Sequence, residues 1–257
     1  MVSANNLFLS RAENGGGVSL KLKNFVGRVK WLAWAKANGC PWNEETCAYA
    51  AQGGQLEVLQ WARERGCEWD RRTFACAAMG GHLEVLQWAR EHDCPRDGFT
   101  CRYAAENGHL EVLQWARQHD FPWNEAVCAG AAAGGHLQVL QWARENGCAW
   151  DVHTCAQAAM GGHLEVLRWA REHDCRWSVM TCHNASQGGH LEVLQWAREN
   201  GCPWDEVTCV RAAQFGRLVV LRWARAHGCE WTASYCARLA ERAGHAEVAW
   251  WVRAQDP

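Results

Sequence analysis

Cysteine and histidine are the residue types in this sequence that could do chemistry, and both recur at fixed spacings. The 257 residues include 15 cysteines and 12 histidines. Thiols and imidazoles bind soft and borderline metal ions, and thiols can also react with oxidants. All cysteines but Cys76 fall on two ladders with a step of 27 residues: Cys40, Cys67, Cys94, Cys148, Cys175, Cys202 and Cys229 on one, and Cys47, Cys101, Cys128, Cys155, Cys182, Cys209 and Cys236 on the other.

The spacing of the cysteines favours core packing over metal binding. Zinc sites usually need close pairs such as Cys-x2-Cys, whereas neighbouring ladder cysteines alternate between steps of 7 and 20 residues. Phe74 and Phe121 occupy two ladder positions, and phenylalanine can replace a buried apolar filler but not a metal ligand. We therefore expect no metal. Two alternatives stay open, namely oxidant sensing at Cys76 and pairing within a repeat, such as Cys40 with Cys47.

A histidine series recurs with the same period, at His82, His109, His136, His163 and His190. Gln55 and Arg217 replace it in two repeats, which favours a turn-stabilising hydrogen bond over catalysis or metal binding. The sequence contains no nucleophile elbow, phosphate-cradling glycine loop or paired acid and base. We expect a protein that is not an enzyme and uses no cofactor.

Tryptophan marks the repeat most clearly. Of the 18 tryptophans, one ladder contains Trp34, Trp61, Trp88, Trp115, Trp142, Trp169, Trp196 and Trp223, and another contains Trp42, Trp69, Trp123, Trp150, Trp177, Trp204 and Trp231. Their 27-residue register within apolar segments predicts that they belong to the core. Arginines from Arg63 to Arg225 and glutamates from Glu57 to Glu192 recur as well, and we expect them on a solvated face with charge pairs between adjacent repeats.

Two short helices per repeat must position these residues. In the repeat that begins at Asp151, a first helix carries Cys155, Ala158 and Ala159 as one apolar stripe, and the glycines at 161–162 end it. A second helix follows from residue 163 to about 172, with an apolar arc wide enough to need neighbours on both sides. Side chains able to cap the first helix recur at Asn43, Asp70, Asp97, Asn124, Asp151, Ser178, Asp205 and Thr232.

The repeats resemble the ankyrin repeat family. Ala158, Ala159 and Gly162 match its A-A-x-x-G pattern, GHLEVL at 162–167 matches the start of its second helix, and NGCAWD at 146–151 resembles its G-A-D-x-N corner. The resemblance implies an all-α, ankyrin-like α-solenoid of about nine helix-turn-helix repeats, in which the hairpin between repeats is missing. We expect a flexible segment at 1–15 and a solenoid at 16–257, with an N-terminal cap at 16–42, repeats at 43–231 and a C-terminal cap at 232–257.

Composition excludes several classes of partner. The 26 Lys and Arg against 28 Asp and Glu give a net charge of −2, without the basic surplus expected for nucleic-acid or membrane binding. No signal peptide and no apolar run of the length needed to span a bilayer is present. We expect a cytoplasmic and monomeric protein.

The exposed side of the first helix varies among repeats, while the second helix is almost constant. Because first helices line the concave, ligand-binding side of the solenoids that the chain resembles, we expect a scaffold or adaptor that binds a protein partner there. Aromatic, Met and Arg residues favour such interfaces. The alternative is a cysteine-rich metal- or redox-sensing repeat protein. The candidate binding residues are Tyr49, Arg72, Met79, Phe99, Arg102, Tyr103, Glu106, Gln157, Met160, His183 and Asn184.

Overall fold

The computed structural model describes residues 29–38, 42–96 and 98–255. Every regular element among them is an α-helix, as the repeat pattern predicts. The predicted N-terminal segment at 1–15, the first part of the N-terminal cap, Cys40 and the capping residue Asp97 lie outside the described residues.

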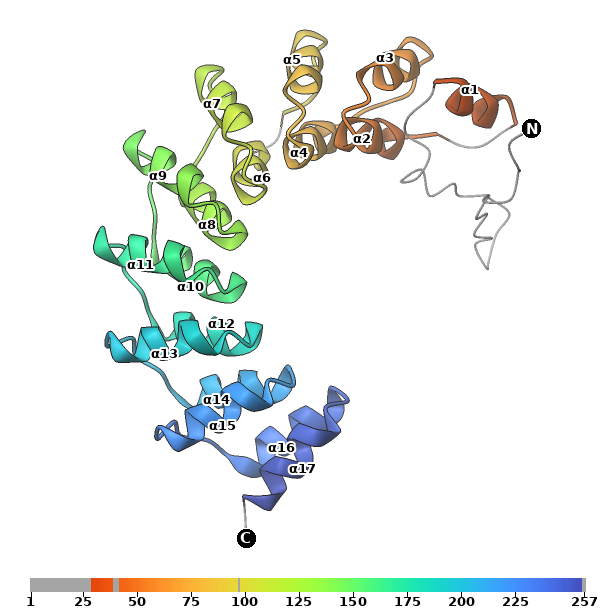
Figure 1. The fold of residues 1–257 in the computed structure, drawn as a ribbon. Coiled ribbons are helices and arrows are strands. Elements are labelled where there is room, and N and C mark those ends of the chain that lie inside the picture. Colours follow the sequence, from red (N-terminus) through yellow and green to blue (C-terminus); the bar gives the residue numbers. More distant parts are fainter. Residues whose placement is uncertain (1–28, 39–41, 97, 256–257) are drawn as a thin grey trace, which may run out of the picture. The chain divides into compact units, whose positions relative to one another are not determined.

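First and second helices alternate along the chain (Figure 1). The first helices are α2 (Glu44–Gln52), α4 (Arg71–Gly80), α6 (Thr100–Glu106), α8 (Glu125–Gly134), α10 (Val152–Gly161), α12 (Val179–Gly188), α14 (Glu206–Gln214) and α16 (Ala233–Arg242). The second helices are α1 (Val29–Ala37), α3 (Leu56–Glu64), α5 (Leu83–Glu91), α7 (Leu110–Gln118), α9 (Leu137–Glu145), α11 (Leu164–Glu172), α13 (Leu191–Glu199), α15 (Leu218–Ala226) and α17 (Ala246–Ala254).

The chain forms two compact units. The N-terminal unit comprises residues 1–104 and 111–121, and the C-terminal unit comprises 105–110 and 122–257. Within the C-terminal unit the first helices α8, α10, α12, α14 and α16 pack one against the next (Figure 1). Each of these five first helices also packs on the second helix that follows it. The repeats of this unit therefore stack as a solenoid requires.

Capping by side chains starts most of the first helices. The side chains of Asn43, Asp70, Asn124, Asp151, Ser178 and Asp205 each accept a hydrogen bond from a backbone N–H of the first turn, which satisfies a donor that the helix itself leaves free. Thr232 was predicted to do the same, but its side chain makes no such bond. At the other end of the helix, Gly135 and Gly162 adopt left-handed φ angles of 75° and 77°, which favour glycine.

Leucine, valine, alanine and cysteine form the core of each repeat. The leucine at the fourth position of the second helix is fully buried in every repeat from Leu59 to Leu221. The first helix contributes small side chains, such as Ala158 and Ala159, and both are fully buried as predicted. Such small residues allow neighbouring first helices to pack closely.

Candidate functional site

The histidine series joins each repeat to the one before it. The imidazole Nε2 of His82 lies 2.9 Å from the carbonyl oxygen of Gln52, at the end of α2. His163 and His190 make the same contact at 3.0 Å with the carbonyls of Ala133 and Met160. The predicted turn hydrogen bond therefore exists, but its acceptor lies in the preceding repeat.

Arg217 shows what this position requires. Its Nε donates to the carbonyl of Gln187 at 3.0 Å, in the same place as the histidines of the other repeats. A methyl group added to Gly162 would lie 2.5 Å from Nδ1 of His190, so the ring occupies the space that the absent side chain leaves. A donor of suitable length is needed here, which is a structural role.

The recurrent arginines hold the loop that follows the second helix. Arg63 donates to the carbonyl of Cys67 at 2.6 Å, and its guanidinium lies 4.3 Å from the ring centroid of Trp69. Arg171 does the same with the carbonyl of Cys175, at 2.5 Å, and with Trp177, at 4.3 Å. The predicted charge pairs with glutamates of adjacent repeats are therefore wrong for these arginines, whose side chains bind a carbonyl and an indole face.

The tryptophans form a half-buried seam. Trp150 packs edge-on against Trp169, with ring centroids 5.8 Å apart, and equivalent pairs recur in both units at 5.4–5.9 Å. Apart from Trp115, which is buried, the described ladder indoles are half-buried. The prediction that they lie in the core is thus wrong, because most of them are only half-buried. Their pairing in most repeats nevertheless supports a packing role.

The cysteines lie in the core, as predicted. Every described ladder cysteine is buried and outside any disulfide, and Cys76 is half-buried. Within residues 29–38, 42–96 and 98–255, no three His, Cys, Asp or Glu side chains gather so as to hold a metal ion. The thiol of Cys47 interacts with that of Cys67, 20 residues later. Cys40, the other partner considered for Cys47, lies outside the described residues.

An aromatic and basic cluster lies at the start of α6 in the N-terminal unit. Phe99 is 53% exposed, and its ring centroid lies 6.2 Å from that of half-buried Tyr103. The guanidinium carbon of half-buried Arg102 lies 5.8 Å from the centroid of the Tyr103 ring. Three of the candidate binding residues are thus brought together, with a large apolar side chain facing solvent.

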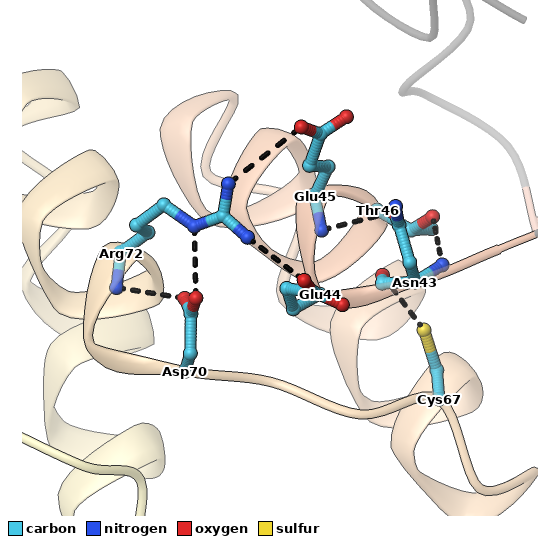
Figure 2. A network of polar contacts seen from close by, with 7 residues as sticks. All are labelled: Asn43, Glu44, Glu45, Thr46, Cys67, Asp70 and Arg72. Atoms are coloured by element: carbon cyan, nitrogen blue, oxygen red, sulfur yellow. Dashed lines mark hydrogen bonds and ion pairs between the residues drawn. The ribbon is translucent and has the colours of Figure 1, made fainter. Parts of the chain in front are cut away.

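Arg72 belongs to an ion-pair network between α2 and α4 (Figure 2). Its Nε lies 2.8 Å from Asp70 Oδ2, and its two terminal nitrogens lie 3.2 Å from Glu44 Oε1 and 3.6 Å from Glu45 Oε1. The hydrogen bond that Arg72 donates to Asp70 and the surrounding carboxylates raise the pKa of Arg72. Three carboxylates therefore surround one guanidinium, and the sequence pattern singled out only the cation.

The other candidates lie on their helices at different depths. Tyr49 in α2 and Met79 in α4 are half-buried, as are Glu106 in α6 and Gln157 and Met160 in α10. In α12, His183 Nε2 lies 2.6 Å from Oδ1 of the capping residue Asp205, and Asn184 donates to the carbonyl of Ala156 at 3.0 Å. His183 and Asn184 thus also link neighbouring repeats.

Part of the predicted exposed face is covered. Ala48, Ala75 and Ala156 occupy equivalent positions on this face of the first helix, but they are only 5%, 8% and 1% exposed. Adjacent first helices cover them, because α2 packs against α4 and α10 packs against its neighbours. A hollow of about 450 Å³ between α11 and α13 was missed. Trp177, Trp196 and Arg168 help to line it, and the assignment of the indoles to the core concealed it.

Comparison with known proteins identifies the repeats. The family model for ankyrin repeats in many copies matches residues 155–198, which run from within α10 to within α13. No curated protein sequence matches the chain. Ankyrin repeats are general protein–protein interaction modules and typically carry no enzymatic activity. None of the described helices combines the length and apolar character needed to cross a membrane. The chain is therefore built from ankyrin-like repeats, and residues 155–198 carry the match to the ankyrin repeat family.

Proposed function

We propose that the chain is a non-catalytic scaffold that binds a protein partner through the variable outer faces of its first helices. In the repeats that it resembles, these faces line the concave side. The observation that carries the proposal is the exposed ring of Phe99 beside Tyr103 and Arg102. Phenylalanine, tyrosine and arginine are enriched at the energetic centres of protein interfaces.

The different roles of the two helices in each repeat support this proposal. Side chains of the second helix and its loop are committed to internal contacts, from the His163 hydrogen bond to the Arg171 contacts with a carbonyl and an indole. The first-helix faces instead differ from repeat to repeat, and they also present Met180, which is 37% exposed. Variation is tolerated where a side chain carries little of the packing.

The proposed surface has two parts, one in each unit. Tyr49, Arg72, Met79, Phe99, Arg102 and Tyr103 form the part in the N-terminal unit, and Glu106, Gln157, Met160, His183 and Asn184 form the part in the C-terminal unit. We rank the N-terminal part first because of Phe99. Arg72 would enter it as a member of its acidic network.

An affinity capture from the source cell tests the proposal. The bait chains are the native protein, the triple variant Phe99→Ala/Arg102→Ala/Tyr103→Ala, and the control Val219→Ala. Val219 is 67% exposed on the second helix α15, so the control removes exposed apolar surface outside the proposed face. We expect a protein that the native chain and the control retain and the triple variant loses. Equal retention by all three chains would show that this cluster is not the binding site.

A further inference from the structure

The thiols of the core come in pairs. One member lies in the first helix and the other in the loop after the second helix, 20 residues later. The two thiols of each pair lie close enough to interact with each other, and every member is at most 1% exposed. The pairs among the described residues are Cys47 with Cys67, Cys128 with Cys148, Cys155 with Cys175, Cys182 with Cys202, and Cys209 with Cys229.

Backbone contacts hold the loop cysteine of each pair at the start of the first helix, which carries the other cysteine. Cys67 Sγ donates to the carbonyl oxygen of Asn43 at 3.3 Å (Figure 2). Asn43 precedes Cys47 by four residues, so both lie on one side of the helix start. The loop cysteine of every other pair contacts the capping carbonyl of its own repeat at 3.2–3.5 Å. Cys155 Sγ also lies 3.8 Å from the carbonyl oxygen of Cys175.

The two thiols of a pair differ in acidity. Interaction with the Cys155 thiol, helped by the guanidinium of Arg171, lowers the pKa of Cys175. The same interaction and burial raise the pKa of Cys155. The pKa values of Cys67, Cys202 and Cys229 are lowered in the same way. The pKa is thus lowered in four of the five loop thiols, each of which also donates a hydrogen bond to a capping carbonyl.

Three positions provide natural comparisons within the chain. Phe74 stands where a thiol would face Cys94, and Phe121 stands where one would face Cys101; the two phenylalanine rings lie 5.5 Å apart. Cys236 has Asp256 at the partner position in the sequence. These cysteines are as buried as the others, at 5% or less, but have no thiol at the 20-residue step.

We propose that these five pairs are sites of reversible oxidation, at which a peroxide closes a disulfide within a single repeat. The thiolate of one cysteine of the pair attacks one peroxide oxygen, the O–O bond breaks, and a sulfenic acid and water form once a proton is taken up. The thiol of the other cysteine then attacks this sulfur; the S–S bond forms, the S–O bond breaks, and a second water leaves. Two thiols lose two electrons in total, and one hydrogen peroxide gains them.

The inference goes beyond partner binding because the pairs lie in the core and not on the variable faces. A closed disulfide would tie the loop of each repeat to the start of its first helix and so restrict the unfolded chain. Because the thiols are buried, the peroxide must reach them during local opening of the loop. The expected consequence is a stiffer repeat under oxidising conditions.

Peptide mapping after mild oxidation tests the proposal. The reduced native protein is treated with hydrogen peroxide at concentrations that leave its helical circular dichroism unchanged; free thiols are then alkylated under denaturing conditions. We expect linked peptides for the five pairs, alkylated Cys94, Cys101 and Cys236, a higher melting temperature, and full reversal by a dithiol reductant. The variant Cys175→Ala should lose only the link to Cys155, while the matched control Cys101→Ala should oxidise as the native chain does.

Three results would overturn the proposal. The first is links between cysteines of different repeats, or to Cys94 and Cys101, as frequent as those of the pairs. The second is oxidation that occurs only with loss of helical signal. The third is a native chain that retains a soft metal ion on these thiols and forms no linked peptides.

Discussion

The two sides of each repeat differ in how much their residues vary. The second helix and the loop after it are nearly constant from repeat to repeat, whereas the outer face of the first helix varies. On the second-helix side, the same side chains make the same contacts in repeat after repeat, as His163 and His190 do with the carbonyls of the preceding repeat. On the first-helix side, equivalent positions hold Arg72, Phe99 and Met180, three unrelated side chains that are all exposed. Constancy therefore marks most of what holds the repeats together. Variation marks the surface that we propose for a partner, although Arg72, His183 and Asn184 on that side also link neighbouring repeats.

Truncation of a buried side chain on the constant side should cause the largest loss of stability. Leu167 is fully buried in α11, so Leu167→Ala should lower the free energy of unfolding by about 2–5 kcal/mol. Half-buried Met160 on the variable face is the matched control, and Met160→Ala should cost clearly less. Urea denaturation followed by circular dichroism measures both, and equal losses would contradict the division.

The tryptophan seam should contribute less than the core. Trp142 is half-buried and lies 5.9 Å from Trp123, centroid to centroid, so Trp142→Ala should lower the free energy of unfolding by about 2 kcal/mol, below the roughly 3–5 kcal/mol of a fully buried aromatic residue. Differential scanning calorimetry would detect the change. An unchanged melting curve would show that the indole pair contributes nothing to stability.

The hydrogen bond from the histidine to the preceding repeat should contribute still less to the free energy of unfolding. His163→Ala removes the bond to the carbonyl of Ala133 and should cost about 1 kcal/mol. His163→Arg should restore most of this loss, because Arg217 makes the equivalent bond in its own repeat. If arginine is no better than alanine in urea denaturation, the bond is not the reason for the histidine.

Lowering the pH should cause the smallest of these losses in the free energy of unfolding. Burial lowers the pKa of His136 from its ordinary value of 6.5, so the unfolded chain takes up the proton more readily than the folded one. The corresponding stability is present above pH 6.5 and is lost as the pH falls from there through the folded-state pKa. The variant His136→Gln, which copies Gln55, should lose less unfolding free energy than the native chain between about pH 7.5 and pH 5.5. An identical pH dependence would contradict this.

Local rules made much of the fold predictable from the sequence. Capping residues, glycine pairs and the apolar arc set the helix limits, and the substitution of Phe74 for a ladder cysteine correctly indicated a buried position. These signals act within a few residues or follow from the 27-residue period. The binding residues were chosen on chemical type and variation, and they stay a prediction.

Depth and long-range partners were not predictable in the same way. A period tells which positions are equivalent but not how far from solvent they lie, so half-buried Trp150 was assigned to the core. The acceptor for His163 lies 30 residues earlier, at Ala133, and the thiol partner of Cys155 lies 20 residues later, at Cys175. Such contacts depend on how helices and repeats pack, which spacing alone does not encode.

The division between the two sides is tested most directly by the free energies of unfolding of two triple variants, measured side by side. One carries Phe99→Ala/Arg102→Ala/Tyr103→Ala on the variable face, and the other carries His163→Ala/Leu167→Ala/Trp169→Ala on the constant side. We predict that the second variant loses at least about 3 kcal/mol more than the first, because it removes buried packing and an inter-repeat hydrogen bond. Equal losses, or a larger loss for the variable face, would contradict the account.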